Sequence, residues 1–380
     1  MGRFNHLVIG TALLALSGCN QELSNLTIPG LFSTIAPVLP INPIAGPGPI
    51  ITISPSVTPI PVASGSGSPA SAASYFPSNL YFNQSVASAA VDAQSSTIIN
   101  QLAANGGWGN SNRFQIDFSI NVYYTDSSTV QLPVQDNGMY LPDSDVPATM
   151  PVPPAGGTQG FESSGGRTCD GGDCHYLVMD QTNHQLFETW EANDVTSTHF
   201  GTNGGLAVWP FNKTWLPNFR GDTCSSADAG GLMIAPMLFT AEEIAAGAVN
   251  HAIRLILPNR RIASMTYVRP ATHMTGGSSW ASSATGVPYG ARLRLKSTFD
   301  VSTLPSAGAR TIARALKTYG MILADGGEIA LTAKSDAQSA AKYAGYLSAQ
   351  DLRALQVTDF EMVDGGARFH PTGYDCVRNP

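Results

Sequence analysis

Glu188 is the carboxylic acid whose sequence surroundings best suit acid/base chemistry. It lies in the apolar, aromatic segment LFETW, in a chain where charged residues make up only 12% of the total. Burial in such a setting disfavours the ionised form of a carboxyl group and raises its pKa, which suits a general acid at neutral pH. We therefore expect Glu188 to be the catalytic acid if the protein is an enzyme.

Glu188 lies in one of two apolar segments that flank the turn-like sequence QTNH, a pattern that predicts a β-hairpin. We take Asp180 to pair with Gln185. Side-chain alternation then places His175 opposite Trp190 and diagonal to Glu188. We expect His175 to orient the carboxyl group and the Trp190 indole to stack on a sugar ring. The alternative is a hydrogen-bonded His–Glu pair at the rim of a sheet.

Asp228 is the candidate for a second carboxylate. It lies among small residues beside Gly230 and Gly231, where a backbone can approach a ligand closely. Two carboxylates that flank a glycosidic bond are the common arrangement for its hydrolysis. Glu188 and Asp228 together therefore predict a glycoside hydrolase, whereas the alternative for Asp228 is a turn or a helix cap.

His251 and Arg269 would serve a lyase instead. His251 lies on the apolar face of a predicted strand, where it is either a catalytic base or a satisfied core residue. Arg269 and His273 lie where a strand runs into a Gly/Ser-rich loop that contains Trp280, and such loops often carry sites. Arg269, His273 and Trp280 are therefore predicted to bind substrate, with Arg269 neutralising a uronate. The base would be His175 or His251.

Three basic residues alternate along the predicted strand 292–296, so Arg292, Arg294 and Lys296 share one face. On a concave sheet face they would bind an anionic polymer such as a uronic-acid chain. On a solvated face they would have no such role.

Several familiar catalytic motifs are missing from the sequence. There is no G-x-S-x-G, H-E-x-x-H or P-loop, and no G-x-G-x-x-G after a predicted strand. The spacing of His175, His251 and His273 matches no metal-binding pattern. We therefore predict no metal and no cofactor.

These residues leave three functions open. The first is an extracellular carbohydrate-active enzyme that cleaves a polysaccharide by acid/base chemistry of the glycoside-hydrolase type. The alternative is a non-catalytic surface lipoprotein that binds glycans or has a structural role. A polysaccharide lyase acting on a uronic-acid polymer is the second alternative.

The N-terminal segment predicts export. Residues 1–18 combine Arg3 with an apolar run of about ten residues, too short to cross a bilayer, as in a secretory signal peptide. The run ends in LSGC, which resembles a bacterial lipobox, so Cys19 is the predicted lipidated residue. Residues 19–74 are rich in Pro and Ser and predict a disordered stalk. We expect a protein of the bacterial cell envelope, in the outer membrane or at the cell surface, that meets the membrane only through this lipid.

The composition of the chain limits the remaining classes. The net charge of −7 argues against nucleic-acid binding, and the scarcity of charge argues against a helical bundle. Residues 75–380 are predicted to form one globular β-rich domain. We expect a single β-sandwich or jelly-roll-like fold that is mainly β, with a few short peripheral helices.

Apolar segments between turn residues define the expected elements. The predicted strands are residues 113–124, 175–180, 185–190, 205–211, 249–257, 265–269, 291–296 and 320–324. The predicted helices are residues 86–104, a short helix capped by Thr240 and Glu243, residues 307–319, and a last short helix from Ser348. Residues 141–167 are predicted to form a long surface loop.

Four cysteines follow Cys19, and an even number in an exported protein implies disulfides. Of the three possible connectivities we favour Cys169 with Cys174 and Cys224 with Cys376.

A series of segments, in this order, is similar to a group of exported bacterial proteins. The segments are NGGWG, IDFSI, CHYLVMD, LFETW, SADAGG, HAIR, YVRPATH, ARLRLK and ALKTYGMILADGG. The resemblance covers most of residues 95–365 and implies a single domain. It implies no activity and no catalytic residue.

Overall fold

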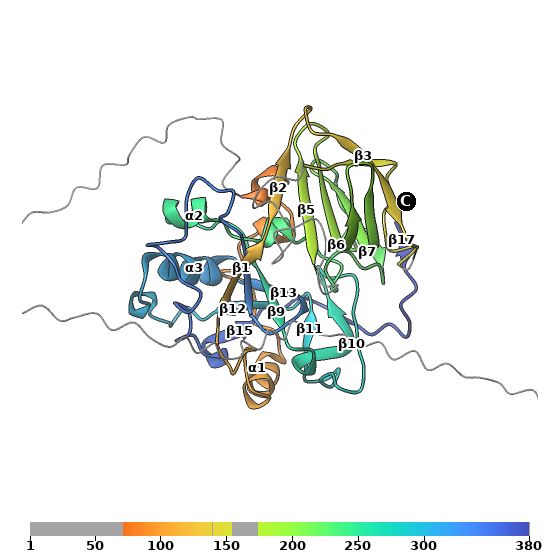
Figure 1. The fold of residues 1–380 in the computed structure, drawn as a ribbon. Coiled ribbons are helices and arrows are strands. Elements are labelled where there is room, and N and C mark those ends of the chain that lie inside the picture. The colour runs from red at the N-terminus through yellow and green to blue at the C-terminus, as the bar shows by residue number, and fades with distance from the viewer. Residues whose placement is uncertain (1–70, 139, 154–173, 380) are drawn as a thin grey trace, which may run out of the picture. The chain divides into compact units, whose positions relative to one another are not determined.

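The computed structural model describes residues 71–138, 140–153 and 174–379, which belong to one compact unit. The predicted signal peptide, Cys19, most of the stalk, and Cys169 lie outside the described residues. The globular part begins earlier than the predicted residue 75, because Ala72 and Ala73 are already buried. The fold is mainly β with few short helices, as predicted (Figure 1).

The first large sheet has six strands in the order β1-β14-β9-β13-β12-β15. These strands are β1 (Ile116–Ile120), β14 (Leu331–Lys334), β9 (Ile253–Leu257), β13 (Met321–Gly326), β12 (Arg292–Leu295) and β15 (Phe360–Met362). β9 runs parallel to β13 and antiparallel to β14, so the sheet is mixed.

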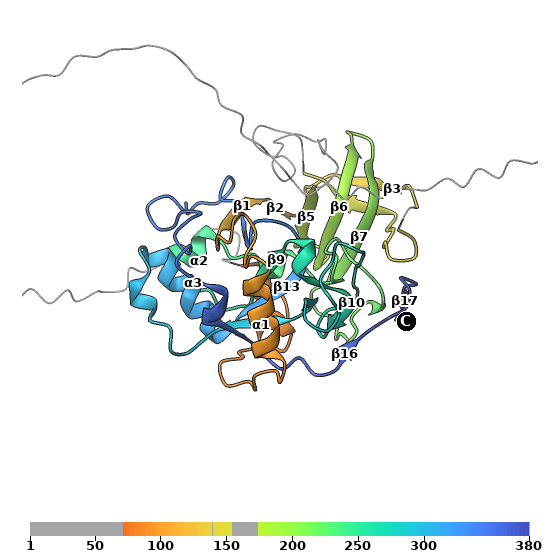
Figure 2. The ribbon, with the colours of Figure 1, turned by 90° about the horizontal axis from the view of Figure 1, so that it is seen from below.

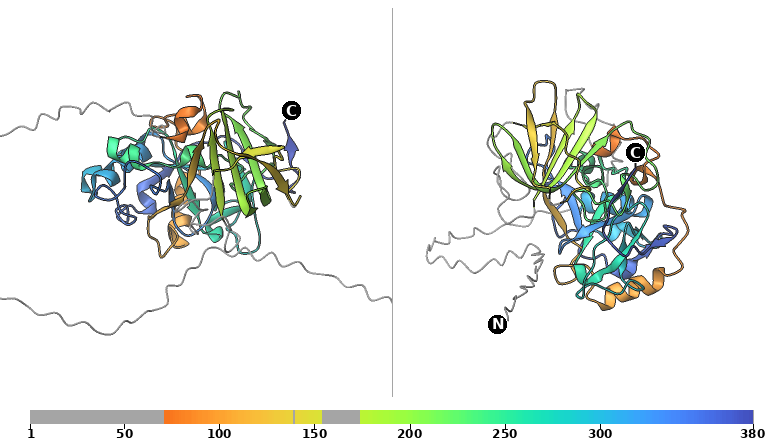
Figure 3. Two further views of the ribbon diagram at one scale, coloured as in Figure 1. Left: turned by 45° about the horizontal axis from the view of Figure 1, so that its top comes forward. Right: turned by 90° about the vertical axis from the view of Figure 1, so that its right-hand side faces the viewer.

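The second large sheet has the order β2-β5-β6-β7-β3-β4. Its strands are β2 (Val122–Thr125), β5 (His175–Asp180), β6 (Gln185–Val195), β7 (Phe200–Pro210), β3 (Gln131–Asp136) and β4 (Thr149–Pro151). β5, β6 and β7 form an antiparallel meander, which Figure 3 shows as a fan of green strands. β4 lies within the segment predicted as a surface loop.

Two smaller sheets complete the strands. One contains β11 (Val287–Tyr289), β10 (Ile262–Val268) and β16 (Arg368–Phe369). The other pairs β8 (Gly221–Asp222) with β17 (Val377–Arg378).

Three α-helices are described: α1 (Ser95–Ala104), α2 (Ala241–Ala246) and α3 (Ala307–Thr318). Figure 2 shows α2 and α3 on the side of the first sheet away from β5, β6 and β7. Short 3-10 helices are Ala72–Tyr75, Tyr81–Asn83, Ala235–Met237, Asn259–Arg261, Val301–Thr303 and Val357–Asp359. None of the helices in the described ranges has the length and apolar character needed to cross a membrane.

The main hydrophobic core contains residues of both large sheets. Leu177 and Leu186 of the second sheet belong to it together with Leu255 and Leu323 of the first. The opposite face of β5 carries Val178, which belongs to a second, smaller core of the second sheet. Both faces of the β5–β6 hairpin are therefore covered, as its continuous apolar sequence predicts.

The predicted strand 113–124 is two strands that belong to different sheets. β1 pairs with β14 in the first sheet, and β2 pairs with β5 in the second. The break falls at Asn121, and the chain crosses here between the sheets. Alternation alone cannot reveal such a crossing because both halves have strand character.

Two helix predictions are partly wrong. The helix predicted from residue 86 begins only at Ser95, because the preceding segment bonds to other elements: the Val86 amide donates to the Thr318 carbonyl at 2.8 Å. The segment after Ser348 forms turns, although Ser348 does bond to Asp351 as a capping residue would. The predicted capping box of Thr240 and Glu243 is present at the start of α2.

The predicted disulfide between Cys224 and Cys376 is present, with an S–S distance of 2.02 Å. It ties the C-terminal segment, with β17, to the loop that follows β8. This loop continues into Asp228 and therefore helps to position the site described below.

Candidate functional site

The β5–β6 hairpin has the register expected from the sequence. Asp180 pairs with Gln185, and His175 lies opposite Trp190. Glu188 lies opposite Leu177 and so belongs to the face that packs toward the first sheet. The hairpin therefore carries both His175 and Glu188 to the junction of the two sheets.

Glu188 is completely buried and is held by three donors. Its Oε1 accepts hydrogen bonds from the amides of Ile234 at 2.8 Å and Ala235 at 2.7 Å, and its Oε2 accepts one from the Trp209 indole at 2.9 Å. Burial and the nearby charge of Asp228 raise the pKa of Glu188 to about 8, although the three donors lower it. The carboxyl group thus fixes the start of the 3-10 helix that follows Asp228.

Asp228 is also completely buried, and it forms an ion pair with Arg254 of β9. Arg254 Nη2 lies 2.7 Å from Asp228 Oδ1, and Nε lies 3.2 Å from Oδ1 and 3.1 Å from Oδ2. A two-point contact of this kind holds a carboxylate in one orientation. The backbone of Asp228 also begins a turn, because the Gly231 amide donates to the Asp228 carbonyl at 2.9 Å, so the turn expected as the alternative is present together with the ion pair.

Asp325 shares Arg254 with Asp228. Its Oδ2 lies 3.3 Å from the same Nη2, and its side chain is 23% exposed, in contrast to Asp228. A β-bulge between Leu323 and Asp325 changes the register of β13 at this point. Asp325 is consequently the acid of this group that meets solvent.

The two acids on Arg254 differ in their surroundings. Burial and the negative charge of Asp228 raise the pKa of Asp325 to about 8, whereas Arg254 and His175 lower it. The protonated form of Asp325 is therefore favoured relative to that of an exposed carboxylic acid. An acid that keeps its proton beside an ion-paired carboxylate is a recognised arrangement for proton donation.

Two histidines contact the segment that carries Asp228. His175 Nε2 lies 3.2 Å from the Ala227 carbonyl, and His273 Nδ1 lies 2.7 Å from the Ala229 carbonyl. Burial lowers the pKa of His273. The predicted residues His175, Glu188, Asp228 and His273 are thus brought together around residues 227–235.

His251 lies apart from this group. It is 1% exposed; its Nδ1 bonds to the Ala252 carbonyl at 2.8 Å, and its Nε2 lies 3.3 Å from Glu243 Oε1. Glu243 is the residue that caps α2. His251 is therefore the satisfied core residue that the sequence left as its alternative.

The side chain of Arg269 is already bound to other residues of the same chain. It forms an ion pair with Asp222, donates to the Ala271 carbonyl at 3.2 Å, and lies 4.4 Å from the ring centre of Phe369. Its guanidinium group already neutralises a carboxylate. This arrangement gives little support to a role in binding a uronate.

The basic residues of β12 are also bound to other parts of the protein, which corrects both alternatives expected for this strand. Arg292 donates to the carbonyls of Tyr81 at 2.9 Å and Gln84 at 2.8 Å. Arg294 forms an ion pair with Glu361. These cations bind neighbouring segments, so the face is neither a solvated surface nor an anion-binding stripe.

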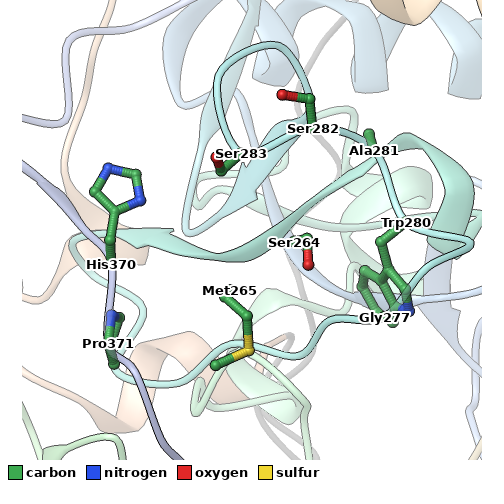
Figure 4. A pocket seen from close by; sticks show the side chains of 9 residues that line it. All are labelled: Ser264, Met265, Gly277, Trp280, Ala281, Ser282, Ser283, His370 and Pro371. Carbon is green, nitrogen blue, oxygen red and sulfur yellow. The ribbon is translucent and has the colours of Figure 1, made fainter.

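The two tryptophans predicted to bind substrate have different surroundings. Trp190 packs edge-on against Tyr140, with ring centres 5.6 Å apart. Trp280 lines a surface cavity of about 480 Å³ (Figure 4). Trp280 therefore lies at a surface cavity, and Trp190 packs against another aromatic ring.

Asp325 and Arg254 are the residues of this site that the sequence analysis missed. A signal was present: Asp325 is a charged residue at the end of an apolar strand and precedes Gly326 and Gly327. The same kind of signal drew attention to Asp228 beside its glycines. Arg254 gives no such local signal, because its partners lie 26 and 71 positions away in the sequence.

Comparison with protein families, with curated proteins and with solved structures finds no match for this chain. Within the described ranges, no group of three or more His, Cys, Asp and Glu side chains is arranged to hold a metal ion. The chemistry that the arrangement offers is proton transfer from Asp325, next to the fixed negative charge of Asp228.

Proposed function

We propose that this protein is an exported carbohydrate-active enzyme that cleaves a polysaccharide, with Asp325 rather than Glu188 as its general acid. The observation that carries the proposal is the partly exposed carboxyl group of Asp325, bound to the same guanidinium nitrogen as the buried Asp228. Proximity to a second acid and burial favour the protonated form, which is the form a general acid needs.

Asp325 would give its proton to the oxygen of the leaving sugar. The bond between the anomeric carbon and that oxygen breaks with positive charge developing on the sugar ring, and a nearby carboxylate stabilises such charge. A water molecule then adds to the anomeric carbon and loses a proton to solvent, from which Asp325 is protonated again. Asp228 supplies a negative charge at a fixed place, since Arg254 holds it at two points. Asp228 is closed to solvent, so its role is electrostatic rather than covalent.

Glu188 supports the site indirectly in this proposal. Its bonds to the amides of Ile234 and Ala235 fix the chain that follows Asp228. His175 contacts the Ala227 carbonyl on the other side of Asp228. Both residues then position the acid pair and make no contact with substrate.

The proposed location is the bacterial cell envelope, with the chain held by a lipid on Cys19. The lipobox-like sequence and the Cys224–Cys376 disulfide support export, because disulfides persist in oxidising compartments.

A non-catalytic glycan-binding lipoprotein is the second candidate. The complete burial of Glu188 and Asp228 favours it, since neither predicted catalytic acid reaches solvent. The lyase has the least support, because Arg269 is paired with Asp222 and His251 with Glu243.

The test is the Asp325→Asn variant on a panel of neutral and uronic-acid polysaccharides. Release of reducing ends reports hydrolysis, and ultraviolet absorbance of unsaturated products reports a lyase. We expect kcat to fall by about 10²- to 10⁴-fold, the usual contribution of a general acid. Asp364→Asn changes an exposed acid in the same way and is the matched control, with unchanged activity expected.

Full activity of Asp325→Asn would overturn the assignment of Asp325. A Glu188→Gln variant that loses activity while Asp325→Asn keeps it would return the role to Glu188. If the wild-type protein binds a polysaccharide without releasing product, the second candidate replaces the enzyme.

A further inference from the structure

A surface cavity of about 480 Å³ lies against β10, in the small sheet of β11, β10 and β16 (Figure 4). Its volume is within the range of small-molecule sites, roughly 300–1,000 Å³. It is built by residues from three parts of the chain: β10, the loop around Trp280, and the segment after β16. Its lining residues are Ser264, Met265, Gly277, Trp280, Ala281, Ser282, Ser283, His370 and Pro371.

The aromatic part of the lining is the indole of Trp280. The side chain is partly buried against the main core, and its ring centre lies 6.5 Å from that of Tyr289. Gly277 lies against the indole, because a Cβ there would be 3.2 Å from Trp280 Cδ1. Packing on one side thus holds the ring in place at the edge of the cavity. A fixed aromatic side chain of this kind loses little entropy when a ligand binds.

The polar part of the lining is neutral. Ser264, Ser282 and Ser283 bring hydroxyl groups, each of which can donate and accept hydrogen bonds. None of the nine lining residues is Asp, Glu, Lys or Arg. The cavity therefore suits a neutral ligand with many hydroxyl groups better than a uronate or a phosphate.

A contact with Thr266 positions the imidazole of His370. Thr266 Oγ1 lies 3.1 Å from His370 Nδ1, and the Thr266 hydroxyl also bonds to the Ser264 carbonyl at 2.9 Å. The contact involves Nδ1, so Nε2 is the ring nitrogen that can form a hydrogen bond with a ligand hydroxyl, as donor or acceptor according to the tautomer.

We propose that this cavity is a non-catalytic binding site for a neutral sugar unit of a polysaccharide. The indole supplies a platform for the apolar face of the sugar ring, and the serines and His370 bind its hydroxyl groups. The site goes beyond the proposed enzyme activity, because it includes none of the acids around Arg254. It would hold a polysaccharide chain on the protein whether or not Asp325 cleaves it.

The experiment is isothermal titration calorimetry of the protein with cellohexaose, chitohexaose and xylohexaose, and with a galacturonic-acid oligomer as the charged comparison. We expect at least one neutral oligosaccharide to bind more tightly than the charged one. We expect Trp280→Ala to weaken that binding by about tenfold or more, since aromatic anchors often dominate binding energy.

A second variant guards against a folding defect in Trp280→Ala. The double variant Ser282→Ala with Ser283→Ala removes two hydroxyl groups from the lining, and we expect it to weaken binding severalfold. The matched control is Ser278→Ala with Ser279→Ala, in the same loop but outside the lining, which should bind as the wild type does.

Three results would overturn the inference: no heat of binding with any neutral oligosaccharide, a preference for the charged oligomer, or unchanged binding in both the Trp280 and the Ser282/Ser283 variants. Asp325→Asn separates this inference from the proposed activity. If that variant keeps oligosaccharide binding while product release is lost, both proposals stand. If the wild type binds through Trp280 but cleaves nothing, only the proposed activity fails.

Discussion

Three acids meet at the junction of the two large sheets, and their different partners give them different chemistry. Glu188 has three N–H donors, and Asp228 has a two-point contact with Arg254. Asp325 lies 3.3 Å from Arg254, accepts a hydrogen bond from the Gly326 amide at 2.7 Å and is partly exposed to solvent. Charges in a protein interior cost several kcal/mol each unless they are paired and hydrogen-bonded. Asp325 is the only one of the three that is partly exposed, and its pKa, like that of Glu188, is raised to about 8.

Asp325 should make the stability of the protein depend on pH in a defined direction. Its folded-state pKa of about 8 lies above the unfolded value of about 3.9. The folded protein therefore holds a proton that the unfolded chain releases, and this stabilisation is lost as pH rises through the folded pKa. We expect the free energy of unfolding to fall between about pH 5 and pH 8, less steeply in Asp325→Asn than in the wild type.

Urea titrations at a series of pH values measure this effect. Each unit of pKa shift between the folded and unfolded states changes the free energy of unfolding by about 1.4 kcal/mol. Glu188 contributes a slope of the same sign to both proteins, so the difference between them isolates Asp325. Asp364→Asn should follow the wild-type curve. Identical slopes in Asp325→Asn and the wild type would show that Asp325 is ionised throughout.

At the scale of elements, the predictable parts were those in which local signals agree. The β5–β6 hairpin has a turn sequence between two apolar segments, so its register followed from the sequence alone. The cap of α2 was likewise a local pattern. Asp325 and Arg254 were missed because their meeting depends on the parallel pairing of β9 with β13, which no local pattern encodes. The crossing between β1 and β2 was missed for the same reason.

The turn that carries Asp228 depends on Gly231. Its φ of +73° is left-handed, and a Cβ there would lie 2.2 Å from Thr272 Oγ1 and 2.6 Å from the Cys224 carbonyl. Gly247, at the end of α2, has a similar φ of +77°, but a Cβ there would have no neighbouring atom within 4 Å. A comparison of alanine variants at the two glycines therefore separates the cost of a left-handed backbone from the cost of a steric clash.

We expect Gly247→Ala to lose only about 1–2 kcal/mol, the cost of a left-handed alanine. Gly231→Ala should lose clearly more, because the new methyl group collides with backbone as well. Denaturant unfolding of both variants gives the comparison. Gly231→Ala should also reduce any activity that depends on Asp228, and equal losses in the two variants would contradict the close packing described at Gly231.

At the scale of the whole molecule, long-range links hold distant parts of the chain together. Arg254 binds acids from two different segments, and the Cys224–Cys376 disulfide joins residues 152 positions apart. The C-terminal segment also pairs through β17 with β8. The loop that carries Asp228 is thus tied on one side to the first sheet and on the other to the C-terminus.

Removing the disulfide with Cys224→Ala and Cys376→Ala should lower the stability by about 2–5 kcal/mol, as expected for a cross-link that closes a long loop. Denaturant unfolding of the double variant and the wild type, both without reductant, measures this. Adding reductant should destabilise the wild type more than the double variant, which keeps only the short-loop disulfide predicted between Cys169 and Cys174. A double variant as stable as the oxidised wild type would contradict the role given to this bond.

The contacts of Arg292 and Arg294 with residues 81–89 have a mechanical consequence. Arg292 donates hydrogen bonds to the carbonyls of Tyr81 and Gln84, and Arg294 donates one to the Ala89 carbonyl at 3.0 Å. A force that pulls on the chain ahead of Ser71 would therefore be passed in part to β12, the strand of the first sheet that pairs with β13, before it reaches α1. Tension along the chain would thus be borne in part by two guanidinium groups.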